Sequence, residues 1–258
     1  MACALMYPRV KNPCIICEKR EGEYTCDSGK VCGICMPEEF LGKKNVNKTK
    51  IIIFTKTKKN WKRAGIRKSE RDFAEIPSHS SAVTPGCGFA LIDALEESAS
   101  HADGIDIVVS FIKMSGLNLM IDWLRERAEE GTKIRTITTS FMGSTEAEAV
   151  IELASLPNTE VKFEFDATAE DHIHAKSFIF TSPNGNGEAY VGSANISKSA
   201  LTTAEEWGIR IMESDLPDIF RELRDAYDKL WESPSLQTVS EGDRAKMELA
   251  LSKKRMGR

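Results

Sequence analysis

The chain has 258 residues, enough for one large domain or for a medium domain with a smaller one. Hydrophobic residues make up 41% and charged residues 29%, a composition that excludes collagen-like, disulfide-scaffold and largely disordered proteins. No apolar stretch approaches the roughly 20 residues that cross a bilayer, and the first residues lack the basic leader and apolar run of a secretory signal. We therefore expect a soluble, cytoplasmic protein without a membrane partner.

The net charge of −4 hides a strong asymmetry along the chain. Residues 1–72 carry 17 Lys and Arg against 8 Asp and Glu, whereas residues 73–258 carry a net charge of −13. Most of the positive excess lies in a basic segment, residues 43–75, which would attract a polyanion and holds an aromatic ring, Trp61, able to stack on a base. The same stretch fits a solvated linker whose lysines only keep the chain soluble, so charge alone leaves both interpretations open.

Cysteines cluster near the start of the chain, where five of the seven fall within 22 residues. Two CxxC pairs separated by 14 residues have the spacing of a tetrahedral zinc site, with the thiolate ligands Cys14, Cys17, Cys32 and Cys35. Disulfides are disfavoured in the cytoplasm, and a redox CxxC usually occurs alone. Cys26 is either a spare thiol in the spacer or a substitute for one of these ligands. We predict that residues 1–42 form a small module stabilised by a structural Zn²⁺.

After a turn-rich segment at residues 76–88, apolar positions alternate between helical and strand spacing. Helices are predicted over residues 89–101, 116–130, 144–156 and 216–231, the third with a capping box at Ser144, and strands over 105–111, 133–139, 160–165, 173–181, 188–191 and 207–212. This order is typical of an α/β fold with a largely parallel first part, followed by a hairpin around residues 182–187. Residues 233–258 are predicted to be a frayed polar tail.

One short segment concentrates basic side chains of two kinds. If residues 173–181 form a strand, side chains alternate between its faces, so His172, His174 and Lys176 point the same way. Such a triplet could bind an anion. The two histidines alone equally fit ordinary surface residues of a strand or an HxH metal pair, since an HxK sequence often occurs by chance.

A second polar group follows the next predicted strand. At residues 192–195 the backbone N–H groups, together with the Ser193 hydroxyl and the Asn195 amide, could hold an anion. Imidazole, ammonium, hydroxyl and amide groups that meet at one place would bind a phosphodiester. His174 could then attack phosphorus to give a phosphohistidine, with Glu206 orienting and stabilising the imidazole. The candidate catalytic residues are His174, Lys176, Ser193, Asn195 and Glu206.

The order of HxK, GSxN and then Glu resembles the phospholipase D superfamily, whose signature reads HxKxxxxD followed by GSxN. The positions that match in place are His174, Lys176, Gly192, Ser193 and Asn195. The resemblance covers residues 88–232 and is strongest toward the phospholipase D-like domain of some bacterial helicases and certain restriction endonucleases. It implies a phospholipase D-like mixed sheet flanked by helices, and hydrolysis of phosphodiesters with no catalytic metal.

Two positions depart from the family pattern. The expected acidic residue after the lysine is Thr181, which puts that contact in doubt. The chain also has one HxK, whereas the reaction needs one histidine as nucleophile and another as general acid. We therefore predict a homodimer with a shared site on its two-fold axis. The alternative is that His172 serves as the second imidazole within one chain.

The zinc module and the positive N-terminal part favour nucleic acid over phospholipid as the substrate. The leading hypothesis is a dimeric nuclease that acts on DNA in a restriction or other defence system, with a helicase or methyltransferase as a further partner. One alternative, favoured by Thr181, is a module that binds nucleic acid without cleaving it. The other is a lipid or small-molecule phosphodiesterase.

Overall fold

The computed structural model describes residues 24–26, 29–31, 76–85, 87 and 89–256. The predicted zinc ligands, Cys14, Cys17, Cys32 and Cys35, and the basic segment, residues 43–75, lie outside the described residues. The chain divides into two units, Met1–Arg67 and Lys68–Arg258. In the first unit the described residues form an antiparallel hairpin of β1 (Tyr24–Cys26) and β2 (Gly29–Val31).

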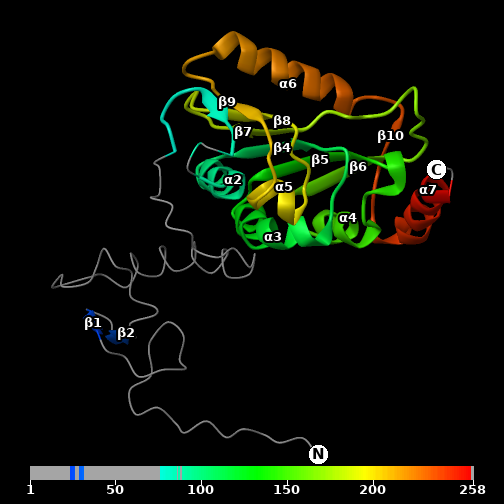
Figure 1. The fold of residues 1–258 in the computed structure, drawn as a ribbon, viewed down its shortest axis with the longest axis horizontal. Coiled ribbons are helices and arrows are strands. Elements are labelled where there is room, and N and C mark those ends of the chain that lie inside the picture. The colour runs from blue at the N-terminus through cyan, green and yellow to red at the C-terminus, as the bar shows by residue number, and fades with distance from the viewer. Residues whose placement is uncertain (1–23, 27–28, 32–75, 86, 88, 257–258) are drawn as a thin grey trace, which may run out of the picture. The chain divides into compact units, whose positions relative to one another are not determined.

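The second unit is built on an eight-stranded mixed sheet in the order β10-β6-β5-β4-β7-β8-β9-β3 (Figure 1). Its strands are β3 (Ser81–Val83), β4 (Gly104–Val108), β5 (Lys133–Thr139), β6 (Thr159–Glu164), β7 (Ser177–Thr181), β8 (Glu188–Gly192), β9 (Gly208–Met212) and β10 (Leu236–Thr238). Only β4, β5 and β6 are parallel to one another, and every other neighbouring pair is antiparallel. The predicted mixed sheet and the predicted hairpin between β7 and β8 are therefore confirmed.

Helices cover both faces of this sheet (Figure 1). On one face lies α6 (Pro217–Trp231), and on the other lie α2 (Leu91–Ala99), α3 (Met114–Glu129), α4 (Ala147–Ala154) and α5 (Lys198–Thr202). The predicted capping box at Ser144 is wrong, because α4 begins at Ala147 and its N-cap residue, Glu146, makes no side-chain cap bond. Among the described residues, no helix has the length and apolar character needed to cross a bilayer.

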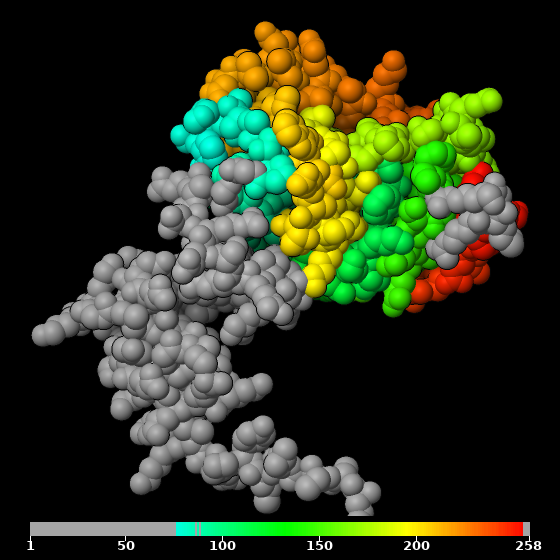
Figure 2. Space-filling model, in the orientation of Figure 1, coloured from blue at the N-terminus to red at the C-terminus, as the bar shows by residue number. Residues whose placement is uncertain are grey.

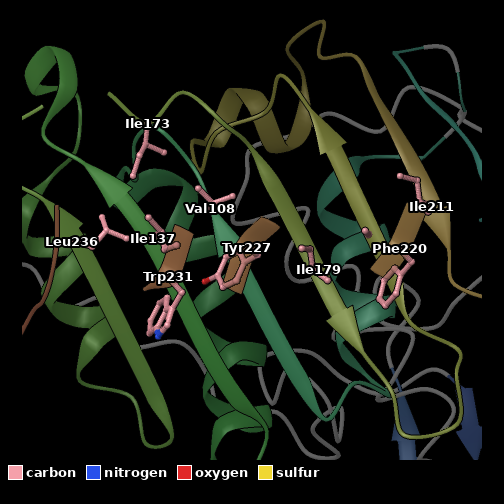
Figure 3. Close-up of a cluster of buried hydrophobic side chains, with 10 residues drawn as sticks. Val108, Ile137, Ile173, Ile179, Ile211, Phe220, Tyr227, Trp231 and Leu236 are labelled. Atoms are coloured by element: carbon pink, nitrogen blue, oxygen red, sulfur yellow. The ribbon is translucent and has the colours of Figure 1, made fainter. Parts of the chain in front are cut away.

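An apolar cluster fills the space between α6 and the sheet (Figure 3). From α6 it takes Phe220, Tyr227 and Trp231, which are spaced by seven and four residues and so lie on one stripe of the helix. Figure 3 shows these rings over aliphatic side chains of the strands, among them Val108 and Ile137. The stripe explains why a helix with mostly polar residues packs firmly against the sheet.

The prediction that residues 233–258 form a frayed tail is wrong, because residues 233–256 are folded. They add β10 to the edge of the sheet beside β6, followed by the short turn η3 (Glu241–Asp243) and by α7 (Arg244–Met256). Met247 and Leu251, four residues apart on α7, are buried, and the Lys246 ammonium lies 4.0 Å from the centre of the Phe165 ring. The sequence analysis missed this helix because Met247 and Leu251 lie among mostly polar residues. The turn-rich segment before residue 88 likewise contributes a strand, β3, at the opposite edge.

A buried ion pair joins β8 and β9 near the β3 edge. The Arg210 guanidinium donates two hydrogen bonds to the Glu188 carboxylate, at 2.7 and 3.0 Å, and a third to the carbonyl oxygen of Pro77. The same carboxylate accepts a hydrogen bond from the Ser98 hydroxyl of α2 at 2.5 Å. These bonds connect the segment before β3, the sheet and α2 through one buried charge pair.

Removing one charge of this pair should destabilise the fold strongly. Glu188→Gln leaves the buried Arg210 without its counter-charge, and we expect a loss of about 3–5 kcal/mol in the free energy of unfolding. Urea denaturation measures this value. The matched control is Asp218→Asn, which breaks an exposed ion pair with Arg221 and should cost less than about 1 kcal/mol. Equal effects of the two substitutions would contradict the assigned role.

Candidate active site

The predicted catalytic residues come from loops at one edge of the sheet. Because β4, β5 and β6 are parallel, their carboxyl ends meet at this edge, where β8 also ends and β7 and β9 begin. The loops at this edge carry His174 and Lys176 just before β7, Ser193 and Asn195 just after β8, and Glu206 just before β9. The topology thus brings together residues that are up to 32 positions apart in the sequence.

The segment with the histidines is a loop, not the strand that was predicted, because β7 begins only at Ser177. A side chain, rather than a neighbouring strand, holds this loop. The buried carboxylate of Glu164, at the end of β6, accepts a hydrogen bond from the Ile173 N–H at 3.1 Å. The rings of His172 and His174, on either side of Ile173, lie with their centres 6.0 Å apart in an edge contact. The two rings are therefore neighbours, as predicted, without belonging to a strand.

Lys176 places a positive charge under the site. Its side chain is 9% exposed, and its ammonium donates hydrogen bonds to the Ser110 hydroxyl at 2.9 Å and to the His174 carbonyl oxygen at 2.6 Å. Burial lowers the pKa of Lys176, and the nearby Glu206 carboxylate partly offsets this effect. An ammonium has three N–H donors, so one of them is left for a bound anion.

The loop with Asn195 is fixed by contacts to the residues after β4. The Phe111 N–H donates to the Asn195 side-chain oxygen at 3.1 Å, which assigns that atom as the acceptor and leaves the amide N–H₂ group to donate. In the next residues, the Lys113 N–H donates to the Ile196 carbonyl oxygen at 2.8 Å. Gly116 of α3 approaches this backbone so closely that an added Cβ would lie 2.5 Å from it.

Ser193 and Glu206 form a unit of their own. The Ser193 hydroxyl donates a short hydrogen bond to the Glu206 carboxylate and accepts one from the Trp207 N–H at 3.1 Å. The Ser193 N–H donates to the Trp207 carbonyl oxygen at 3.0 Å. Glu206 was predicted to orient His174, but the hydrogen-bond partner that the structure gives it is Ser193. The carboxylate therefore orients the hydroxyl and acts on Lys176 through its charge.

His174 is exposed and has the electrostatics of a nucleophile. The positive charge of Lys176 lowers the pKa of His174, with smaller effects in the same direction from desolvation and from His172. A lowered pKa keeps the imidazole neutral at neutral pH, with an electron pair available on one nitrogen. Its neighbour His172 stacks on the Phe141 ring with the ring centres 3.5 Å apart.

Thr181, which replaces the expected acidic residue, lies away from the site. It is the last residue of β7, five positions after Lys176, which corresponds to roughly 16 Å along a strand. Its hydroxyl donates to the Asp103 carboxylate at 3.1 Å, so an acidic side chain from another loop occupies this neighbourhood. The position of Thr181 therefore gives no reason to expect that the missing acidic side chain impairs the candidate active site.

Two residues that hold the site were missed by the sequence analysis. Ser110 binds Lys176, and Glu164 binds the loop that carries the histidines. Both are polar residues at the carboxyl end of a predicted buried strand, which is the signal that could have identified them. In the part of the chain that the structure describes, no group of three or more His, Cys, Asp and Glu side chains is arranged to hold a metal.

Solved structures with a similar fold were found, whereas no curated protein matches the chain. NucT from Helicobacter pylori is 18% identical with a TM-score of 0.47, over 60% of this chain and 96% of that chain. Nuc from Salmonella typhimurium, a phospholipase D family member, is 15% identical with a TM-score of 0.48, over 63% and 98%. Phosphatidylserine synthase from Haemophilus influenzae Rd KW20 is 10% identical with a TM-score of 0.45, over 76% and 48%.

A protein-family model covers the part of the chain that builds the site. The family is described as cardiolipin synthase, PLD-like domain, and the match runs over residues 91–231. These residues extend from the first residue of α2 to the last residue of α6, and they include all five predicted catalytic residues. Because the match spans more than half of the chain, the protein belongs to the phospholipase D-like family.

Proposed function

We propose that this phospholipase D-like enzyme hydrolyses phosphodiester bonds of nucleic acid, with His174 as the nucleophile. One observation carries the proposal: the exposed imidazole of His174 lies beside the buried Lys176 ammonium, which lowers its pKa. The ammonium and the Asn195 amide both keep N–H donors for phosphate oxygens. Together they supply a nucleophile and the positive charge that a phosphodiester needs.

The reaction proceeds in two displacements. An imidazole nitrogen of His174 gives its electron pair to phosphorus, the bond from phosphorus to the leaving oxygen breaks, and a second imidazole gives that oxygen a proton. Water then loses a proton to the second imidazole, attacks phosphorus and breaks the N–P bond. Lys176 and Asn195 stabilise the phosphate oxygens in both steps, so the mechanism needs no catalytic metal.

The second imidazole comes from another copy of the chain. The sequence has one HxK, and the neighbouring histidine, His172, is stacked on Phe141 with a ring nitrogen that is buried and has no partner among the described residues. A homodimer in which each protomer supplies its His174 to one shared pocket provides both roles by symmetry.

Charge supports nucleic acid as the substrate, and the resemblance to domains of restriction endonucleases favours DNA. Residues 73–258 carry a net charge of −13, so attraction of a polyanion must come from the basic segment, residues 43–75. Cys14, Cys17, Cys32 and Cys35 would hold a structural Zn²⁺ in the module before it. The resemblance to domains of helicases and restriction endonucleases supports a cytoplasmic role in restriction or another defence system, with a helicase or methyltransferase partner.

The first prediction concerns the protonation of His174. Its pKa should lie below the ordinary value of 6.5, because the Lys176 charge disfavours the imidazolium form. NMR titration of the His174 ring measures it, and Lys176→Met should move the midpoint upward. In the shared site one His174 ring must be neutral to attack and its partner must be protonated to act as the acid, so kcat/KM should pass through a maximum near the midpoint and fall at both lower and higher pH. A wild-type midpoint at or above 6.5 would contradict this account.

The second prediction is cleavage of DNA in the presence of EDTA. His174→Ala should lower the rate at least about a thousandfold, since the nucleophile is removed. The matched control is His79→Ala, a change of another exposed histidine far from the catalytic loops, and it should leave the rate unchanged. Binding of DNA without cleavage would favour the non-catalytic module, and turnover of phosphatidyl substrates instead of DNA would favour the lipid enzyme. Before any chelator is added, metal analysis of the purified protein should find about one Zn²⁺ per chain, and less than about half an equivalent would count against the zinc module.

The third prediction concerns the dimer. Sedimentation should give twice the 28.7 kDa of one chain. When wild-type and His174→Ala chains are co-expressed in equal amounts and pair at random, a shared site that needs both imidazoles leaves about one quarter of the wild-type activity. Independent sites would leave about one half. A monomer that retains full activity would rule out the shared site.

A further inference from the structure

Trp207 is a large aromatic side chain that the fold leaves in solvent. It is 69% exposed, more than any other large hydrophobic side chain among the described residues. Tryptophan is highly buried on average in folded proteins, and its flat face is suited to stacking. Trp207 directly follows Glu206 of the catalytic group, so its exposure occurs beside the reacting centre.

The backbone of Trp207 is locked to the phosphate-binding loop. Its N–H donates to the Ser193 hydroxyl at 3.1 Å, and its carbonyl oxygen accepts from the Ser193 N–H at 3.0 Å. The backbone segments of Gly192 and Trp207 approach so closely that a Cβ on Gly192 would lie 2.4 Å from the same carbonyl oxygen. The start of the indole side chain is therefore held at a fixed position relative to a predicted phosphate ligand.

Trp207 also lines a pocket that reaches the catalytic residues. Lys176, Ser193 and Glu206 form its polar side. The rest is mainly apolar, with Val83, Pro85, Phe89, Leu201 and Ile209. Figure 2 shows the cyan segment around β3 beside the yellow segment that carries α5 on this face, and both segments contribute to the lining. A chemical group that enters this pocket would therefore lie next to a phosphate bound at the candidate site.

The lining favours a flat ring with polar edges over a hydrocarbon chain. Three hydroxyl side chains, Thr84, Thr202 and Thr203, line the pocket together with the Glu206 carboxylate. The Thr202 hydroxyl already donates to the Lys198 carbonyl oxygen at 2.6 Å. An acyl chain would remove the Thr84 and Thr203 hydroxyls and the Glu206 carboxylate from water without offering them a hydrogen-bond partner, which is unfavourable. A nucleobase offers a face for the indole and donors and acceptors at its edge.

We propose that Trp207 and this pocket bind the base of a nucleotide next to the scissile phosphate. This inference rests on the proposed nuclease function and adds a substrate requirement. A base that stacks on a protein side chain must leave its own stack and its pairing partner, so the preferred substrate is single-stranded or locally unpaired nucleic acid. The subsite accepts different bases, because each of them has a face that can stack.

The test compares two single-stranded 12-mers, one of thymidine residues and one in which every base is absent. Wild-type enzyme should cleave the thymidine strand with a kcat/KM about 5- to 150-fold higher, since stacking of one base is worth about 1–3 kcal/mol. Trp207→Ala should remove this preference by raising KM for the thymidine strand, with kcat and the abasic strand little affected. Trp207→Phe should retain part of the preference. The control is Leu249→Ala, which removes another exposed apolar side chain, on α7.

Binding provides a measurement that does not depend on cleavage. Fluorescence anisotropy with the His174→Ala chain should show tighter binding of the thymidine strand, and adding Trp207→Ala should abolish the difference. If wild-type enzyme cuts both strands equally well, or if Trp207→Ala retains the preference, the base subsite is wrong and the nuclease function stands. If neither strand is cut but binding still depends on Trp207, the nuclease function fails alone. If Trp207→Ala turns a dimer into a monomer, the ring belongs to the subunit interface and the inference is overturned.

Discussion

The site depends on one buried ammonium. Lys176 is held from below by the Ser110 hydroxyl and from its own loop by the His174 carbonyl oxygen, so its charge cannot move away from the imidazole. That charge is the first cause of the lowered pKa of His174. An ammonium at this place can supply positive charge for phosphate oxygens, a role that a divalent cation has in metal-dependent phosphodiesterases. The proposed nucleophile and the fixed positive charge beside it therefore come from two residues that are separated by a single alanine.

The change of strand direction in the middle of the sheet makes this arrangement possible. β4 is parallel to β5 on one side and antiparallel to β7 on the other, so the carboxyl ends of three strands share an edge with the start of β7. The parallel half supplies residues that support the loops, Ser110 and Glu164, whereas the loops of the antiparallel half carry the candidate catalytic residues. Neither half contains a complete site.

Periodicity predicted the regular elements well where one apolar pattern dominates, as in the strand at residues 133–139, which the structure reproduces. Periodicity failed where side-chain contacts determine the local backbone conformation. The strand predicted from residue 173 begins only at Ser177, since the Glu164 carboxylate holds the preceding loop. It also missed α7, whose burial depends mainly on Met247 and Leu251. The family motif selected candidate residues that the fold places on neighbouring loops, but the Ser193 partner of Glu206 required coordinates, because no spacing rule encodes a contact across 13 residues.

The acidic charge of residues 73–258 opposes the binding of the proposed polyanionic substrate, and a stacking subsite would reduce that opposition. Residues 73–258 carry a net charge of −13, so phosphate contacts beyond the reacting one would be opposed by the surrounding field. Stacking on Trp207 needs no positive charge and is not opposed in this way. In the proposed arrangement the lysines of residues 43–75 would attract the strand and determine the salt dependence, while the indole ring would hold a base of any kind beside the phosphate that His174 attacks.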